Sequence, residues 1–140
     1  MAELNHSNLS VIQKVEMPTA TFVEMEHDII MIHYKNFDEE IDLKKAQEHT
    51  KLICDLRNNK PCYIILNFLN VNVVFSNQAR DHFATDPSYS QIRLSQAMII
   101  EGLAQKIVAN FYRSFHKPNC PVEFFSNEKD AIIWTLSQQS

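Results

Sequence analysis

The sequence predicts a single-domain α/β protein with a mixed β-sheet. Three observations support this prediction. The length of 140 residues is that of one ordinary domain. Two strand-like stretches near the start follow each other directly, as in a hairpin. After them, stretches of helical period alternate with strand-like stretches, and this alternation implies parallel strands joined by right-handed crossovers. The predicted element order is β-β-α-β-α-β-α-β-α, with no internal repeat and no interdomain linker.

The predicted hairpin comprises strands at residues 19–25 and 29–34. Both stretches are rich in β-branched and aromatic residues, which favour strands. The Glu-His-Asp sequence between them is typical of a turn. Residues 1–17 are polar and weakly patterned. We therefore expect residues 1–18 to be an N-terminal tail, ordered at most near Val11 and Ile12, ahead of a domain at residues 19–138.

The middle of the chain predicts a helix, a buried strand and a second helix. Helical spacing of apolar residues begins at Leu43, and Asp42 before it is a suitable N-cap. Pro61 cannot extend a helix, so a strand starts after it at residues 62–66. This strand does not alternate, as expected where a sheet is covered on both faces. Ser76 then caps the next helix, because its hydroxyl can accept a hydrogen bond from an amide of the first turn.

The C-terminal part predicts two further strand–helix pairs. Before them, Asp86 and Pro87 mark another helix start, with Asp as N-cap and Pro at the first helical position. The remaining elements are expected at residues 95–100 (strand), from about Gly102 (helix), 122–125 (strand) and 127–137 (helix capped by Ser126).

Composition narrows the range of functions. The net charge of -4 argues against a nucleic-acid-binding protein, which would carry a basic stripe. No apolar run reaches 18 residues, so no membrane span is expected, and the N-terminus lacks a signal-peptide pattern. The three cysteines (Cys54, Cys62 and Cys120) have no CxxC spacing, which favours reduced thiols and a cytoplasmic protein. The single Gly102 excludes glycine-rich phosphate loops. Because the six histidines form neither HxH nor HExxH, we expect no metal site and no cofactor.

The element order and one local stretch resemble the STAS domain, the fold of bacterial anti-sigma-factor antagonists. STAS domains carry a strand ending in Asp, a short loop, and an Asp-Ser-x-Gly motif whose Ser is phosphorylated in switch members. Residues 64–67 (Ile-Ile-Leu-Asn) resemble the strand end, with Asn in place of Asp. Residues 75–78 (Phe-Ser-Asn-Gln) match the motif at Ser76 only. Over residues 19–138 the chain is therefore similar to the uncharacterised bacterial STAS-like proteins that lack the switch motif.

The first function that we expect is a non-enzymatic regulatory or protein-interaction module. It would contact an unidentified protein through the strand-to-helix junction at residues 67–80, and it is also compatible with a homodimer. A helix N-terminus at Ser76 can hold an anion or accept a phosphate. Arg80 lies one turn further on and can pair with a phosphate or a partner carboxylate. Equally, Ser76 can be an ordinary N-cap and the asparagines ordinary turn residues. The expected contact residues are Asn67, Asn70, Asn72, Asn77 and Arg80.

The second function that we expect is a carrier for a small apolar or lipid-like ligand. Its pocket would lie under the helix that starts near Gly102 and would involve Ile107, Phe111 and Phe115. The same residues could instead be plain core, since Leu103, Ile107, Phe111 and Phe115 form a stripe at helical spacing. A cavity of about 300 Å³ or more would favour the carrier, and a solid core would favour the interaction module. No nucleophile–base pair is recognisable, so an enzyme is not expected.

Overall fold

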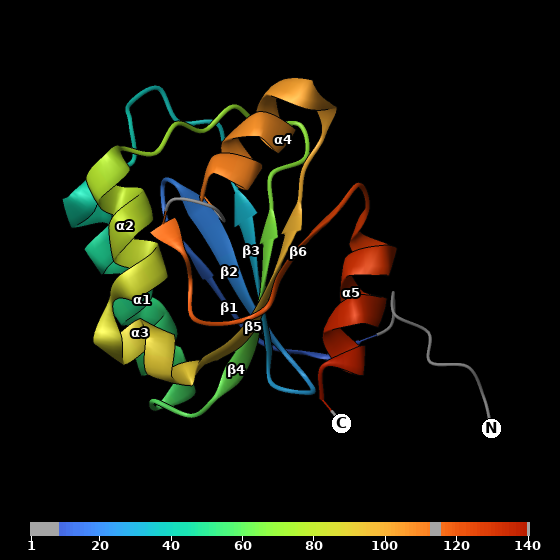
Figure 1. Cartoon of the computed structure of the whole chain (residues 1–140). Helices are drawn as coiled ribbons and strands as arrows, with labels where there is room; N and C mark the ends of the chain where they lie inside the picture. Colours follow the sequence, from blue (N-terminus) through green and yellow to red (C-terminus); the bar gives the residue numbers. More distant parts are fainter. Residues whose placement is uncertain (1–8, 113–115, 140) are drawn as a thin grey trace.

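The described part of the protein is one six-stranded β-sheet with helices on both faces (Figure 1). The structure is a computed structural model, and it describes residues 9–112 and 116–139. In these residues no helix is long and apolar enough to cross a membrane. The strands are β1 (Val11–Glu16), β2 (Ala20–Met25), β3 (Ile29–Tyr34), β4 (Cys62–Asn67), β5 (Arg93–Ile99) and β6 (Val122–Phe125). The helices are α1 (Leu43–Arg57), α2 (Asn77–Thr85), α3 (Pro87–Ile92), α4 (Gly102–Phe111) and α5 (Glu128–Ser137).

The strands lie side by side in the order in which they occur in the chain. β1, β2 and β3 form an antiparallel meander, whereas β3, β4, β5 and β6 are parallel. When parallel strands are added in one direction by right-handed crossovers, every crossover helix must lie on the same face. Accordingly, α1 to α4 are associated with one face of the sheet, and α5, which follows the last strand, packs on the other (Figure 1). The mixed-sheet prediction is confirmed.

Side-chain caps fix the start of four helices. The side chain of Asp42 accepts a hydrogen bond from the amide of α1 three residues later, at 3.0 Å, and Ser76 does the same for α2 at 3.0 Å. Asp86 caps α3, with a proline at the first helical position. These three predicted caps are confirmed. The predicted cap of the last helix is wrong by one residue, because Asn127 rather than Ser126 accepts from the amide of the first turn, at 2.8 Å.

Strand β1 was not expected, and the prediction of a tail over residues 1–18 is wrong where it includes this strand. β1 pairs antiparallel with β2 along the edge of the sheet. Most of its side chains are exposed, so the stretch has no hydrophobic alternation that could have predicted a strand. Backbone pairing holds it in place, together with an ion pair of 2.6 Å between Glu16 and Lys35.

The sheet has a hydrophobic core on each face. Along β3, Ile30 and Ile32 belong to the core under α1 to α4, while Ile29 and Met31 belong to the core under α5. All of them are buried, which explains why these strands read as continuous apolar runs. The expectation that the strand after Pro61 is covered on both faces is confirmed, because its central residues contribute to both cores.

Candidate ligand-binding cavity

The larger core contains a cavity of about 200 Å³. Its walls come from β3, β4 and β5, from the segment between β4 and α2, and from one side each of α2, α3 and α4. Most of the lining is apolar or aromatic, and no Asp or Glu is among the described residues that line it. Lining residues from the strands and from α4 include Ile32, Leu66, Met98 and Ala109.

Hydrogen bonds at three asparagines hold the segment between β4 and α2 in shape. The side chain of Asn67 accepts a hydrogen bond from the backbone amide two residues later, at 3.0 Å, as in an Asx turn. Asn70 adopts a left-handed backbone conformation with φ of 63°, and its amide donates to Glu101 at 2.7 Å. The amide of Asn72 donates to the side chain of Asn36 at 2.9 Å. Asn67 therefore shapes the loop through its side chain and Asn70 through its left-handed backbone, in keeping with the turn interpretation, whereas Asn72 contributes its backbone amide.

The start of α2 places two predicted site residues at different depths. The hydroxyl of Ser76 acts as the helix cap, and its side chain is half-buried. Arg80 runs back along the helix, where its Nη1 donates to the carbonyl of Phe75 at 2.9 Å. Arg80 and Phe75 both line the cavity. Asn77 is exposed on the first turn of α2. The junction predicted as a partner surface is thus also part of the cavity wall.

An aromatic cluster forms much of the cavity lining. The rings of Tyr34 and Phe68 stack with centroids 4.5 Å apart and planes inclined by only 7°. Phe75 meets Tyr34 edge-on, with centroids 5.5 Å apart, and also packs edge-on against Phe83 at 5.9 Å. Phe83 in turn contacts Tyr89 of α3 at 6.4 Å. Offset and edge-to-face pairs of this kind stabilise the arrangement beyond the area that they bury.

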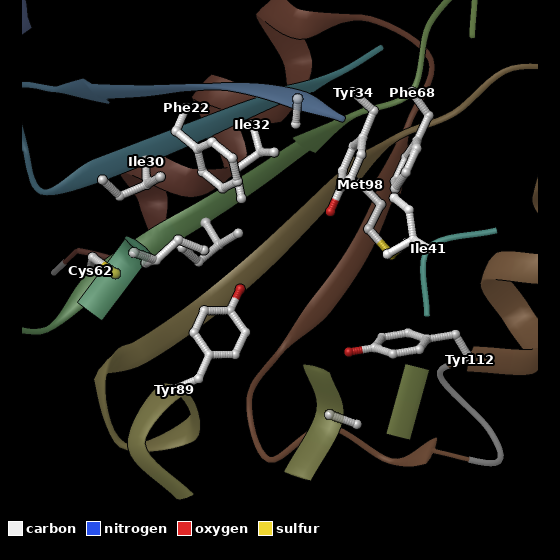
Figure 2. Packing of buried hydrophobic residues seen from close by; sticks show 14 of the residues in the cluster. Phe22, Ile30, Ile32, Tyr34, Ile41, Cys62, Phe68, Tyr89, Met98 and Tyr112 are labelled. Carbon is white, nitrogen blue, oxygen red and sulfur yellow. The ribbon is translucent and has the colours of Figure 1, made fainter. Parts of the chain in front are cut away.

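Three tyrosine hydroxyls point toward the same interior space. Figure 2 shows the hydroxyl ends of Tyr34, Tyr89 and Tyr112 directed toward one another from β3, α3 and the end of α4. Burial raises the pKa of each phenol, and for Tyr112 the neighbouring Arg93 and Gln96 offset part of that rise. All three phenols are therefore neutral near pH 7, and each has an O–H to donate.

Two of the polar groups at the cavity lack a hydrogen-bond partner. Gln96 is 1% exposed and Tyr112 is 6% exposed. Within residues 9–112 and 116–139, neither Nε2 of Gln96 nor the hydroxyl of Tyr112 meets any acceptor or donor with hydrogen-bond geometry. Buried polar side-chain atoms in proteins are usually paired, so two such atoms beside one cavity call for an explanation.

A buried arginine lies next to these groups. Arg93, on β5, is 2% exposed, and its guanidinium lies 4.7 Å from the centre of the Tyr89 ring. Its Nη1 donates to the carbonyl of Phe83 and to Oε1 of Gln96, and its Nη2 donates to the carbonyl of Ala84. These acceptors are all neutral. The described residues provide no carboxylate that forms an ion pair with this charge.

Of the residues predicted to form a pocket under α4, Ile107 does not line the cavity. Ile107 is 60% exposed, and Leu103 at the start of α4 is also exposed, so the prediction that both face the sheet is wrong. The inner face of α4 is instead formed by Gln105, Ala109 and Tyr112. Gln105 fixes this rotation, because its Nε2 donates to two carbonyls of the loop that follows β4. Phe115 and the side chain of Phe111 lie outside the described residues.

The sequence contained one signal for Arg93 and Gln96, two residues at the cavity that the sequence analysis did not select. Arg93 and Gln96 are polar residues inside a stretch that otherwise reads as a buried strand. Buried charged and amide side chains are rare unless they have a partner or a function. The predicted strand began at residue 95, which left Arg93 in the preceding turn and concealed this signal.

The described histidines and cysteines give no sign of a metal or catalytic site. His49 and His82 are each hydrogen-bonded to a threonine, at 2.6 and 2.8 Å. Over the described ranges, no group of three or more His, Cys, Asp or Glu residues is arranged to hold a metal ion. The three cysteines are free, and burial raises the pKa of the Cys62 thiol to about 12, so this thiol is protonated near pH 7.

The chain matches a protein-family model over residues 23–139, and the family is described as "Domain of unknown function (DUF7793)". The chain belongs to this family. None of the curated proteins matches this DUF7793 chain. Among solved structures it is similar to an uncharacterised protein of the DUF3478 family with a SpoIIAA-like fold, from Shewanella loihica PV-4. The two share 13% sequence identity and a TM-score of 0.53, over 96% of this chain and 98% of that one. The STAS-like fold expected from the sequence is thereby confirmed, and at this identity the likeness speaks for the fold alone.

Proposed function

We propose that this DUF7793 protein is a non-enzymatic module that binds a small, mainly apolar molecule in the cavity of its larger core. The cavity itself is the observation that carries the proposal. Protein interiors are normally packed as densely as organic crystals, with few voids larger than a water molecule. A pocket of about 200 Å³ with mainly apolar walls leaves the side chains that line it without packing partners on one side. A ligand that fills the pocket would supply these missing contacts.

The size of the cavity limits the ligand. It is smaller than the roughly 300 Å³ at which drug-sized sites begin, so the volume set above as favouring a carrier is not reached, and the proposal is limited to a smaller molecule. It exceeds the roughly 150 Å³ of an apolar cavity that is large enough for benzene. A single aromatic ring with a short substituent, or a short branched aliphatic chain, matches this volume. A long acyl chain is too large, so we favour a compact ligand over a lipid.

A regulatory role of the strand-to-helix junction is the second candidate. Phe75 and Arg80 line the cavity, while Ser76 and Asn77 between them form the outward start of α2. A ligand packed against Phe75 would stabilise this segment, so binding would change how readily a protein partner can engage it. We expect such a module to act in the cytoplasm, as the cysteine pattern suggested, and in a bacterium, as the STAS-like resemblance implied, and a homodimer is compatible with this role.

The test is binding of ethylbenzene, a neutral probe of suitable size, followed by NMR of methyl groups. We expect ethylbenzene to shift the methyl resonances of Met98 and Ile32, which line the cavity. Ala109→Phe should abolish these shifts, because Ala109 is buried on the cavity side of α4. Ile107→Phe, on the exposed side of the same helix, is the matched control and should leave them unchanged.

Two results would contradict the proposal. One is the absence of shifts at the cavity methyls of the wild-type protein at saturating ethylbenzene. The other is a response of Ala109→Phe that equals the wild-type response while its melting curve shows a folded protein. A companion measurement is native mass spectrometry of the protein purified from its own cells, where a bound natural ligand would add mass that disappears on denaturation.

A further inference from the structure

We infer that the ligand of this cavity carries a carboxylate, which is received by Gln96 and Tyr112, on a compact apolar body. This inference rests on the proposed function, since it names the class of molecule that the cavity holds. Three observations carry it: the fixed orientation of one amide, the unpartnered donors beside it, and a buried positive charge without a counter-ion.

The amide of Gln96 is oriented by Arg93. A guanidinium can only donate hydrogen bonds, so Nη1 of Arg93, 3.2 Å away, must face the carbonyl oxygen Oε1 of Gln96. The NH₂ end of the amide is therefore the group left without a partner, and its assignment does not depend on a free choice between oxygen and nitrogen. Gln96 lines the cavity and is nine-tenths or more buried. It consequently presents two N–H donors, one toward the neighbouring hydroxyl of Tyr112 and the other toward a guest molecule or water in the cavity.

The hydroxyl of Tyr112 is the second donor at this place. It is buried, lines the cavity and makes no hydrogen bond of good geometry within the described residues, although the side chains of Arg93 and Gln96 lie close enough to it to lower its pKa. Because its pKa is raised by burial, the phenol stays protonated and its O–H is available. Tyr34 and Tyr89 direct their hydroxyl ends toward the same space (Figure 2). A ligand that accepts several hydrogen bonds at one end matches this set of donors.

The charge of Arg93 favours a ligand whose hydrogen-bond acceptor is anionic over one whose acceptor is neutral. This guanidinium is buried, and its hydrogen bonds end on neutral oxygens. A buried charge is unfavourable unless an opposite charge compensates it. Among the described residues, no acidic side chain lines the cavity. An anionic end at Gln96 and Tyr112 would lie next to this positive field.

The remaining lining selects against larger or more polar anions. Away from the donors, the wall consists of aliphatic and aromatic side chains such as Phe68, Phe75 and Met98. These would leave the several oxygens of a phosphate group without partners. A carboxylate has two oxygens with about four acceptor positions, which the amide and the phenols can satisfy. Together with the volume, this points to a single-ring or short branched carboxylic acid in its ionised form.

The test compares three probes of similar size by titration calorimetry at neutral pH: phenylacetate, its neutral isostere phenylacetamide, and ethylbenzene. We expect phenylacetate to bind at least tenfold more tightly than phenylacetamide. Tyr112→Phe removes only the hydroxyl and should reduce this preference at least threefold. Tyr63→Phe, a change on the opposite face of the sheet, is the matched control and should preserve it. The comparison of probes on the wild-type protein needs no variant, so a variant that fails to fold does not affect it.

The outcomes separate the inference from the proposed function. If ethylbenzene or phenylacetamide binds as tightly as phenylacetate, the carboxylate inference is wrong, although the cavity still binds small apolar molecules. The same conclusion follows if Tyr112→Phe and Tyr63→Phe retain the same preference for the anion. If none of the three probes binds, the proposed function fails and the inference falls with it.

Discussion

His49 makes the stability of this protein depend on pH in a way that can be measured. The side chain is buried on α1, and its ring lies 5.1 Å from that of Phe22, 6.1 Å from Tyr34 and 6.2 Å from Phe83. Its Nε2 is hydrogen-bonded to Thr19 at 2.6 Å, while Nδ1 has no partner in the part of the chain that the structure describes. Burial among these rings disfavours the imidazolium and lowers the pKa from 6.5 to about 4.

The direction of the effect follows from which state binds the proton first. In the unfolded chain His49 takes up a proton near pH 6.5, whereas in the folded protein it does so only near pH 4. The folded state is therefore fully favoured above pH 6.5 and loses stability as the pH falls toward 4. At 1.36 kcal/mol per pKa unit, the total loss is about 3 kcal/mol, of which about 2 kcal/mol falls between pH 7 and pH 5.

The assay is urea unfolding at pH 7, 6 and 5, followed by the fluorescence of Trp134, the only tryptophan in the sequence. Over this range most carboxyl groups stay ionised in both states, so the histidines dominate the change. Between pH 7 and pH 5, we expect the free energy of unfolding of His49→Gln to fall by about 2 kcal/mol less than that of the wild type. His27→Asn, an exchange in an exposed turn, is the control and should keep the wild-type dependence. Equal pH dependence of His49→Gln and wild type would refute the reasoning.

Three further predictions concern stability at neutral pH, each measured by urea unfolding. Arg57 forms ion pairs with buried Glu24 at 2.8 Å and with Asp28 at 2.6 Å. Arg57→Met should lower the free energy of unfolding by about 3–5 kcal/mol, because the buried carboxylate of Glu24 then has no compensating cation and keeps only its hydrogen bond from Gln13. A loss below about 1 kcal/mol would contradict this. Ser76→Ala should lower the free energy of unfolding by about 1 kcal/mol, because the helix cap is lost. Ser76→Asp should lower it little, because Asp can also cap a helix, and equal losses in the two variants would contradict the capping role. Ile107→Lys should change stability by no more than about 0.5 kcal/mol because the side chain is exposed, and a larger loss would mean that this face of α4 is covered.

Much of the fold can be predicted from the sequence because its signals are local. Asp42, Ser76 and Asp86 each start a helix, since a short polar side chain before a helical stretch satisfies amides only two or three residues away. The strands at Ile29–Tyr34 and Val122–Phe125 were predicted with the correct bounds. The parallel arrangement followed from the alternation of strands with helices, because a parallel connection requires a crossover.

Other features depend on contacts between distant residues. β1 is a strand because the exposed edge of β2 supplies its backbone hydrogen bonds, and its own side chains give no sign of this. The rotation of α4 depends on Gln105, whose partners are more than 30 residues away. From spacing alone, the apolar stripe that includes Ile107 is as good a candidate for the buried face of α4 as the face that carries Gln105. Only the tertiary contacts decide which of the two faces turns inward.

The sequence by itself determined the order of the elements from β2 onward, most helix starts and the STAS-like class of fold, whereas the candidate site was decided by the tertiary structure. A cavity is the space that remains after several elements have packed, and no local pattern encodes a missing volume. Arg93, Gln96 and Tyr112 come from β5 and the end of α4, and they meet only because both elements border that space. Their chemistry depends on burial. In the same small region, burial leaves the guanidinium of Arg93 without a counter-ion and the donors of Gln96 and Tyr112 without a hydrogen bond of good geometry among the described residues.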